Sequence, residues 1–348
     1  MLPNVDPAIL EALGLEPTSS KLVSHGSSGF SSTYKLVAAR DGEDLTYFVK
    51  VGFGPNAEVM FRGSSCQHAN LTTCEYHSLN AIHSAVPDYH FCPRAHAHGA
   101  MRSSPGKFFL VTDFLDLTAS SSSSSGSGSG SSGTGLSLAA KLARLHTTPA
   151  PVPPGFDKPV FGFPVPTCCG ATRQENNFTE SWAEFFANHR LRAILREALR
   201  NNHSAGADEE LVEAVDKVAS VVVPRLLGDG HLKGVVPVVV HGDLWSGNHG
   251  RARIGGKGGV EEVVFDPSSV YGHSEYESGI MRMFGGFGKE FWREYEKLVP
   301  KTEPAHEWED RMLLYELYHY LNHYALFGGG YRGSAMSILR KLIAKYGR

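Results

Sequence analysis

The sequence has few cysteines, and their spacing argues against two classes of site. The five cysteines include no C-x-x-C pair: Cys66, Cys74, Cys92, Cys168 and Cys169. Neither a zinc site built from paired cysteines nor the disulfide framework of a small secreted protein is indicated. We therefore expect reduced thiols and a cytoplasmic protein, with access to the nucleus left open.

Long apolar runs and a strong charge of one sign are also absent. No stretch approaches the roughly 18 consecutive apolar residues that mark a membrane-spanning helix. Residues 1–15 contain acids and prolines instead of the basic start and apolar core of a secretory signal. The formal net charge of −3 gives no basic surface for nucleic acid or anionic lipid. We expect neither a membrane nor a nucleic-acid partner, and a small substrate or a local feature of another molecule.

The most informative stretch follows an apolar run at 235–240, which predicts a buried strand. A polar loop then carries Asp243 and Asn248, and a second apolar run at 263–265 precedes Asp266. An aspartate can accept a proton from a hydroxyl group, while an amide oxygen and a second carboxylate can hold a divalent cation. This order and spacing are typical of protein-kinase-like phosphotransferases. We predict that Asp243 is the catalytic base and that Asn248 and Asp266 bind metal; ordinary turn aspartates are the alternative.

A nucleotide site is predicted near the N-terminus, where apolar runs at 22–23, 33–38 and 46–51 indicate strands. The hairpin between the first two is rich in small residues that can contact phosphate oxygens: Gly26, Ser27, Ser28 and Gly29. Lys50 is the cation in the third strand, and we expect it to bind the α- and β-phosphates. A plain exposed lysine is the alternative.

A glutamate on a helix is needed to hold such a lysine in place. Glu75 lies in a segment, 73–82, with apolar residues at helical spacing, and Glu58 is the rival because it is nearer in sequence. Residues 63–70 between them are polar and indicate an insertion. A later strand, 108–115, ends where a kinase-like chain passes between its lobes, so we expect the adenine to contact its last residues: Thr112, Asp113, Phe114 and Leu115.

Beyond these strands the sequence turns to helical patterns. Residues 120–135 are almost wholly Ser and Gly, which predicts a flexible linker. Amphipathic helices are predicted at 136–146, 181–200, 208–223 and 311–327. In the last of these we expect a stripe of aromatic residues to pack in the core: Tyr315, Tyr318, His319 and His323.

The order of elements predicts an α+β fold with two protein-kinase-like lobes. The first is a small antiparallel sheet lobe for nucleotide binding at 1–116, and the second is a larger, mainly helical catalytic and substrate lobe at 136–348. The Ser/Gly-rich insertion, 117–135, separates them. We expect a monomer, with a dimer as the alternative.

Several stretches together resemble the fructosamine-3-kinase, or ketosamine-3-kinase, family. The resemblance is carried by Val239-Val-His-Gly-Asp-Leu-Trp-Ser-Gly-Asn248, by Phe265-Asp-Pro-Ser-Ser-Val-Tyr-Gly-His-Ser-Glu-Tyr-Glu277, by Met283-Phe-Gly-Gly-Phe287 and by Thr167-Cys-Cys-Gly170. It spans nearly the full chain and is far more specific than the general kinase-like motif.

This resemblance implies the fold of the aminoglycoside phosphotransferases and a reaction with ATP and Mg²⁺. The 3-hydroxyl of a ketosamine would be phosphorylated, on a glycated lysine of a protein or on a free amine. The unstable product then falls off, which implies deglycation and protein repair. By the same resemblance Trp245 would line the sugar site, and His273 and Glu275 are candidates for contact with sugar hydroxyls.

Two other functions remain open at this stage. The same catalytic core serves kinases of aminoglycosides, choline or sugars, because the fold alone does not name a substrate. A non-catalytic nucleotide-binding pseudokinase is the other reading, although it predicts the loss of at least one of Lys50, Asp243, Asn248 and Asp266, and all four are present.

Overall fold

The computed structural model describes residues 5–28, 31–53, 71–117, 133–202 and 208–348. Glu58, the insertion at 63–70 and most of the Ser/Gly stretch lie outside these residues. Contacts divide the chain into two compact units. The first combines Met1–Lys141 with Gly247–Pro267, and the second combines Leu142–Ser246 with Ser268–Arg348. Residues 247–267 therefore group with the N-terminal sheet, although the predicted division assigned them to the C-terminal lobe.

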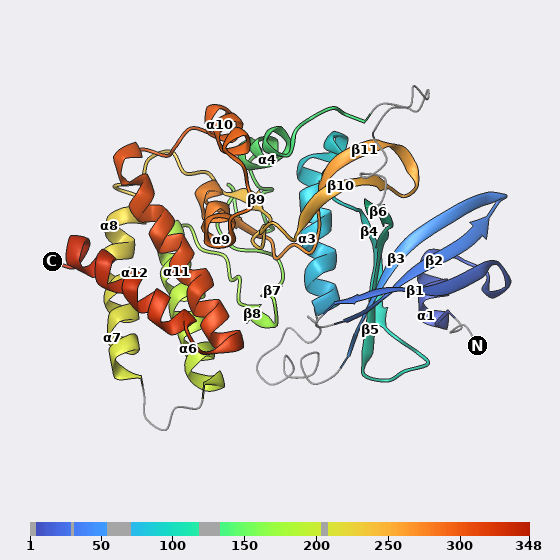
Figure 1. The fold of residues 1–348 in the computed structure, drawn as a ribbon, viewed down its shortest axis with the longest axis horizontal. Helices are drawn as coiled ribbons and strands as arrows, with labels where there is room; N and C mark the ends of the chain where they lie inside the picture. Colours follow the sequence, from blue (N-terminus) through green and yellow to red (C-terminus); the bar gives the residue numbers. More distant parts are fainter. Residues whose placement is uncertain (1–4, 29–30, 54–70, 118–132, 203–207) are drawn as a thin grey trace. The chain divides into compact units, whose positions relative to one another are not determined.

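The first unit is built on a five-stranded antiparallel sheet in the order β1-β2-β3-β5-β4 (Figure 1). Its strands are β1 (Ser20–Ser28), β2 (Ser31–Arg40), β3 (Glu43–Phe53), β4 (Ala95–Ala100) and β5 (Lys107–Asp113). Alternate residues on one face, such as Leu36 and Val49, are fully buried and pack with helix α1 (Pro7–Leu13). The predicted strands of this sheet are thus confirmed.

A helix and a small second sheet complete the first unit. Helix α3 (Leu71–Ala85) packs against β3, β4 and β5, and residues 73–82 form part of it as predicted. The second sheet has the order β11-β10-β6, made by β6 (Leu115–Asp116), β10 (His249–Ile254) and β11 (Lys257–Val264). Buried Lys141 fixes β11, because its ammonium lies 2.7 Å from the carboxylate of Glu261 and 3.0 Å from the carbonyl oxygen of Glu262.

The second unit is mainly helical (Figure 1). Its helices are α5 (Trp182–Phe185), α6 (Ala193–Asn201), α7 (Glu209–Lys217), α8 (Val223–Leu227), α9 (Glu277–Phe284), α10 (Lys289–Leu298), α11 (Trp308–Phe327) and α12 (Tyr331–Tyr346), while α4 (Leu138–Thr147) contains the boundary between the units. Wider π-helical turns, Phe186–Arg192 and Val218–Val222, join α5 to α6 and α7 to α8. The predicted helices are confirmed, whereas α9, α10 and α12 had no counterpart in the sequence predictions.

The second unit also contains two short antiparallel pairs of strands. Strand β9 (Val238–Val240) pairs with β12 (Val270–Gly272), and β7 (Thr167–Cys169) pairs with β8 (Thr172–Gln174). Helix α11 packs against α6, α9 and α12 and forms the centre of the unit. Its predicted aromatic stripe is largely in the core, since Tyr315, Tyr318 and His319 are buried and His323 is half-buried. Among the described residues, no helix is long and apolar enough to cross a membrane.

Candidate active site

The first unit contains a cavity of ≈ 270 Å³ between the sheet, α3 and the end of β11. Residues from most of the predicted nucleotide segments line it: His25, Gly26, Thr33, Phe48, Lys50, Glu75, Leu79, Pro93, Thr112, Asp113, Leu115, Leu117, Phe265 and Asp266. The lining combines aromatic and aliphatic side chains with a few charged groups, as in sites for small ligands and cofactors.

Lys50 is the charged centre of this cavity. Its Nζ lies 2.7 Å from Glu75 Oε2 and 2.9 Å from Asp266 Oδ1, and its side chain is only 14% exposed. Burial alone would lower the pKa of Lys50, but the carboxylates of Glu75 and Asp266 raise it above its ordinary value. Lys50 therefore stays positively charged. Of the two predicted partners, Glu75 makes the ion pair, and Glu58 lies outside the described residues.

The backbone around Gly26 forms part of the wall of the cavity. Gly26 has φ +77°, which favours glycine, and the β1–β2 register shifts between Ser24 and Ser27. The Thr33 hydroxyl donates a 2.6 Å hydrogen bond to the carbonyl oxygen of His25 and so fixes this turn. Ser27 and Ser28 follow at the end of β1, and Gly29 lies outside the described residues.

The end of β5 and the residues that follow it are held by polar contacts. Asp113 Oδ2 accepts from the backbone N–H of Arg94 at 2.9 Å, and Oδ1 lies 2.7 Å from His96 Nε2. Phe114 is buried beneath the Lys35 ammonium, 4.4 Å from its ring centre, and its carbonyl oxygen accepts from Gly255. Thr112, Asp113 and Leu115 line the cavity, whereas Phe114 does not.

Asp266 and Asn248 are joined through the hairpin of β10 and β11. The backbone N–H of Phe265 donates a 3.0 Å hydrogen bond to the carbonyl oxygen of Asn248, which places Asp266 directly beside the start of β10. Asp266 has φ +55° and a side chain 47% exposed, while Asn248 is buried. Among the described residues no cluster of three or more His, Cys, Asp or Glu side chains could hold a metal. One carboxylate and one amide oxygen nevertheless suit Mg²⁺, because water molecules and phosphate oxygens usually provide its other ligands.

In the second unit, the loop that carries Asp243 is fixed by a glutamate of α9. The Glu277 carboxylate accepts from the backbone N–H groups of His241 at 2.5 Å and Gly242 at 2.9 Å. Glu277 is 1% exposed, and although burial opposes its charge, His146 and the His241 backbone lower its pKa. The ionised carboxylate therefore holds the two residues that precede Asp243.

Asp243 is half-buried and shares its loop with an exposed aromatic residue. Its carbonyl oxygen accepts from the backbone N–H of Trp245 at 3.1 Å. Trp245 is 39% exposed, and its ring centre lies 5.8 Å from that of Phe284. Cys169 Sγ lies 3.7 Å from Asp243 Oδ1.

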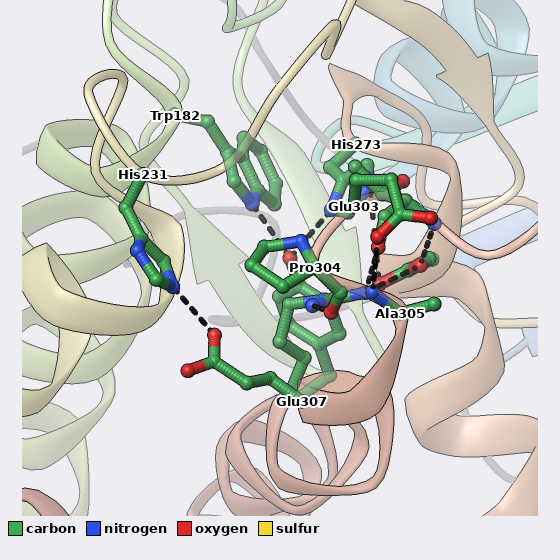
Figure 2. Close-up of polar contacts among 11 residues, drawn as sticks. Trp182, His231, His273, Glu303, Pro304, Ala305 and Glu307 are labelled. Carbon is green, nitrogen blue, oxygen red and sulfur yellow. Dashed lines mark hydrogen bonds and ion pairs between the residues drawn. The ribbon is translucent and has the colours of Figure 1, made fainter.

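His273 and Glu275 occupy a buried network in the second unit. The two ring nitrogens of His273 lie 2.8 Å from the hydroxyls of Tyr315 and Thr302, and the indole N–H of Trp182 donates to the same tyrosine (Figure 2). Glu275 pairs with buried Arg311 and accepts from the backbone N–H of Thr302. Both side chains thus tie down the segment before α11, and their predicted contact with substrate stays a prediction.

The structure brings Lys50, Glu75 and Asp266 together in the first unit, and it places Asp243 and Trp245 on one loop of the second. Sequence reasoning missed Glu277, which contacts His241 through a hydrogen bond that spans 36 residues. The sequence identifies the Thr167-Cys-Cys-Gly170 segment only through the family resemblance, which does not predict the contact of Cys169 with Asp243. No local pattern indicates either contact.

Comparison with known proteins agrees with this architecture. Ketosamine-3-kinase from Mus musculus is 41% identical over 182 residues, which is 52% of this chain and 53% of that protein. A probable ketoamine kinase from Synechocystis is 36% identical over 251 residues, 72% of each chain. The matched stretch thus spans about half of the mouse protein.

Solved structures show the fold. The crystal structure of a candidate fructosamine-3-kinase from Thermobifida fusca has a TM-score of 0.67 at 21% identity and covers 98% of both chains. An aminoglycoside phosphotransferase in complex with ADP and hygromycin B has a TM-score of 0.52 at 13% identity, covering 97% of this chain and 98% of that one. The predicted α+β, protein-kinase-like fold is confirmed.

The predicted family is confirmed by a family model described as fructosamine kinase, which matches residues 34–345. That match covers both units, including Lys50, Glu75, Asp243 and Asp266, so the chain belongs to the fructosamine kinase family.

Proposed function

We propose that this protein uses ATP to phosphorylate the 3-hydroxyl of ketosamines, the sugar adducts that glycation leaves on amines. The observation that carries the proposal is the Lys50 ammonium, held between the carboxylates of Glu75 and Asp266 in a cavity of ≈ 270 Å³. Family membership and the names of the mouse and Synechocystis relatives support the choice of a ketosamine.

The nucleotide is proposed to occupy this cavity. Its apolar walls, including Phe48 and Leu79, suit a flat base next to the segment Thr112–Leu115, and Lys50 provides the point charge for the phosphates. The turn at Gly26 brings backbone close to the same phosphates, because glycine has no side chain to prevent the approach. Glu75 keeps the ammonium in place.

Asn248 and Asp266 are proposed to hold Mg²⁺. The bound ion would neutralise charge on the phosphates. The exposure of the Asp266 carboxylate supports this role, because one oxygen contacts Lys50 while the side chain is still 47% exposed at the cavity. Lys50 would thereby couple the position of the metal-binding carboxylate to that of the phosphates.

Asp243 is proposed to act as the general base. The sugar 3-oxygen forms a bond to the γ-phosphorus, the bond from that phosphorus to ADP breaks, and the hydroxyl proton passes to the Asp243 carboxylate. Most of the rate enhancement in such transfers comes from positioning and from charge neutralisation. Trp245, exposed two residues after Asp243, would pack against the sugar ring or the amine that carries it.

The test is turnover of ATP by the purified protein with Mg²⁺. A ribulosamine and a fructosamine of lysine are compared with choline, an aminoglycoside and free sugars, and the phosphorylated position is identified by NMR. We expect turnover confined to ketosamines, with phosphate on the 3-oxygen. Turnover only with one of the other acceptors would reassign the substrate, and ATP binding without any turnover would support a pseudokinase.

The Asp243→Asn variant tests the base directly. We expect kcat to fall at least about 100-fold, because general base catalysis contributes about that much or more. Binding of ATP, measured by calorimetry, should change little, since no residue of the loop 241–246 lines the nucleotide cavity. A folded Asp243→Asn protein that keeps its turnover would exclude Asp243 as the base.

A further inference from the structure

The β7–β8 hairpin of the second unit is rigidly anchored beside the Asp243 loop. Gln174 at the end of β8 donates from Nε2 to the Tyr318 hydroxyl at 2.5 Å, and its Oε1 accepts from the hydroxyls of Thr167 and Ser268. These four polar groups are buried, and the hairpin also packs on α11. The position of the hairpin's other end, Cys169, is therefore fixed.

The Cys169 side chain lies between two polar groups. Its sulfur lies 3.7 Å from Asp243 Oδ1 and 3.3 Å from Asn322 Nδ2, and the residue is 1% exposed. Asn322 Nδ2 also lies 3.3 Å from the carbonyl oxygen of Cys169. Because that carbonyl can only accept, the Asn322 amide must direct its N–H groups at Cys169.

This geometry sets the direction of the contact with Asp243. The Asn322 amide donates to the sulfur, and an ionised carboxylate can only accept, so the S–H hydrogen is available for Asp243 Oδ1. Burial raises the pKa of the Cys169 thiol well above its ordinary value, and the negative charge of Asp243 raises it further. The thiol is accordingly a stable donor at neutral pH.

We propose that Cys169 is a positioning residue for the phosphoryl transfer: its S–H group, oriented by Asn322, donates to Asp243 and holds that carboxylate in the orientation needed to take the proton of the acceptor hydroxyl. The inference rests on the proposed function, in which Asp243 is the base. Of the two adjacent cysteines, it assigns a role to Cys169 and none to Cys168.

Kinetics of two Cys169 variants test this role. Cys169→Ala removes the donor, and we expect kcat for the ketosamine to fall about tenfold with the KM values for ATP and ketosamine within twofold of wild type, as for the loss of one hydrogen bond. Cys169→Ser restores a hydroxyl donor and should recover kcat to within about threefold of wild type. If Cys169 had a purely structural role, Cys169→Ser would not restore kcat, and Cys169→Ala would not lower kcat while leaving the KM values unchanged.

Cys168→Ala is the control, because Cys168 precedes Cys169 on the same strand and is only half-buried. It should leave kcat unchanged. If Cys169→Ala retains wild-type kcat, or if Cys168→Ala lowers kcat equally, the positioning role is wrong.

Infrared spectroscopy gives a second readout that does not need turnover. The S–H stretching band of Cys169, assigned by subtracting the Cys169→Ser spectrum, should lie at the low frequency of a hydrogen-bonded thiol and should shift upward in Asp243→Asn. An unshifted band overturns the contact whatever the substrate is. A shifted band in a protein that does not phosphorylate ketosamines would instead retain the contact and reject the proposed function.

Discussion

At the scale of single residues, the nucleotide cavity depends on one buried cation with two carboxylate partners. Lys50 contacts Glu75 on α3 and Asp266 after β11, so three segments distant in sequence meet at one ammonium group. Burial raises the pKa of Glu75, but the adjacent Lys50 charge favours the ionised carboxylate. Both carboxylates are therefore needed to fix the position of the ammonium.

Glu75→Gln should therefore weaken the use of ATP. A charge-assisted hydrogen bond contributes about 1.5–3 kcal/mol, so we expect kcat/KM for ATP to fall at least about tenfold. Steady-state kinetics with varied ATP provide the measurement. Glu43→Gln is the control, since Glu43 makes an exposed ion pair with Lys257 at 3.4 Å, and exposed pairs contribute little. Equal effects of the two variants would contradict the role of Glu75.

At the scale of elements, the loop that follows β9 is set by the close approach of its backbone to the segment just before β12. Gly242 has φ +80°, and a β-carbon there would lie 2.1 Å from the carbonyl oxygen of Ser268. The Ser268 N–H in turn donates to the carbonyl oxygen of His241. The Gly242 N–H donates to the Glu277 carboxylate, and the Ser268 carbonyl oxygen occupies the place of a side chain, so only glycine fits at this position.

Gly242→Ala should consequently destabilise the protein by at least about 3 kcal/mol, because it combines a backbone clash with an unfavourable φ. Gly14→Ala separates the two effects. Gly14 also has a positive φ, +62°, but an added β-carbon would meet no atom within 4 Å, so we expect a loss of about 1–2 kcal/mol. Urea unfolding measures both, and a similar cost for the two variants would show that the clash is relieved by movement of the loop.

The sequence predicts elements well where local chemistry determines them. The Asp6 cap and the left-handed Gly14 enclose the first helix, and the Ser181 hydroxyl accepts from the backbone N–H of Glu184. Strand and helix patterns place Lys50 on a strand and Glu75 on a helix, but they leave Glu58 as a rival partner, and the structure shows the pairing with Glu75. Contacts such as Glu277 with Gly242, or Cys169 with Asp243, depend on how distant segments pack, and no periodicity encodes that. The π-helical turn after α5 also lacks a local signal.

At the scale of the whole molecule, buried histidines make the second unit sensitive to acid. Burial lowers the pKa of His273 to about 4, with Glu275 opposing this effect and Arg311 and His146 adding to it. The unfolded chain has a histidine pKa of about 6.5. Between these values the unfolded state binds more protons than the folded state, so stability falls as the pH decreases through this range.

We therefore expect the free energy of unfolding to decrease from pH 6.5 towards pH 4, with His273 contributing up to about 1.4 kcal/mol per pH unit. His273→Gln should be less stable than wild type at pH 7, because its contacts with Tyr315 and Thr302 change, but its stability should decline less steeply with acid. Urea unfolding at several pH values provides the comparison. Parallel curves for the two proteins would contradict this contribution of His273.

The origin of the first unit in two stretches of chain has a consequence for synthesis on the ribosome. When residue 141 has emerged, buried Lys141 still lacks Glu261, Lys50 lacks Asp266, and β6 lacks β10. An unpaired buried charge is strongly destabilising. The unit can therefore close only after residue 267 has been translated, while α9 to α12 of the other unit are still unmade. Nascent chains that end before this point should depend on chaperones to a degree that the finished protein does not.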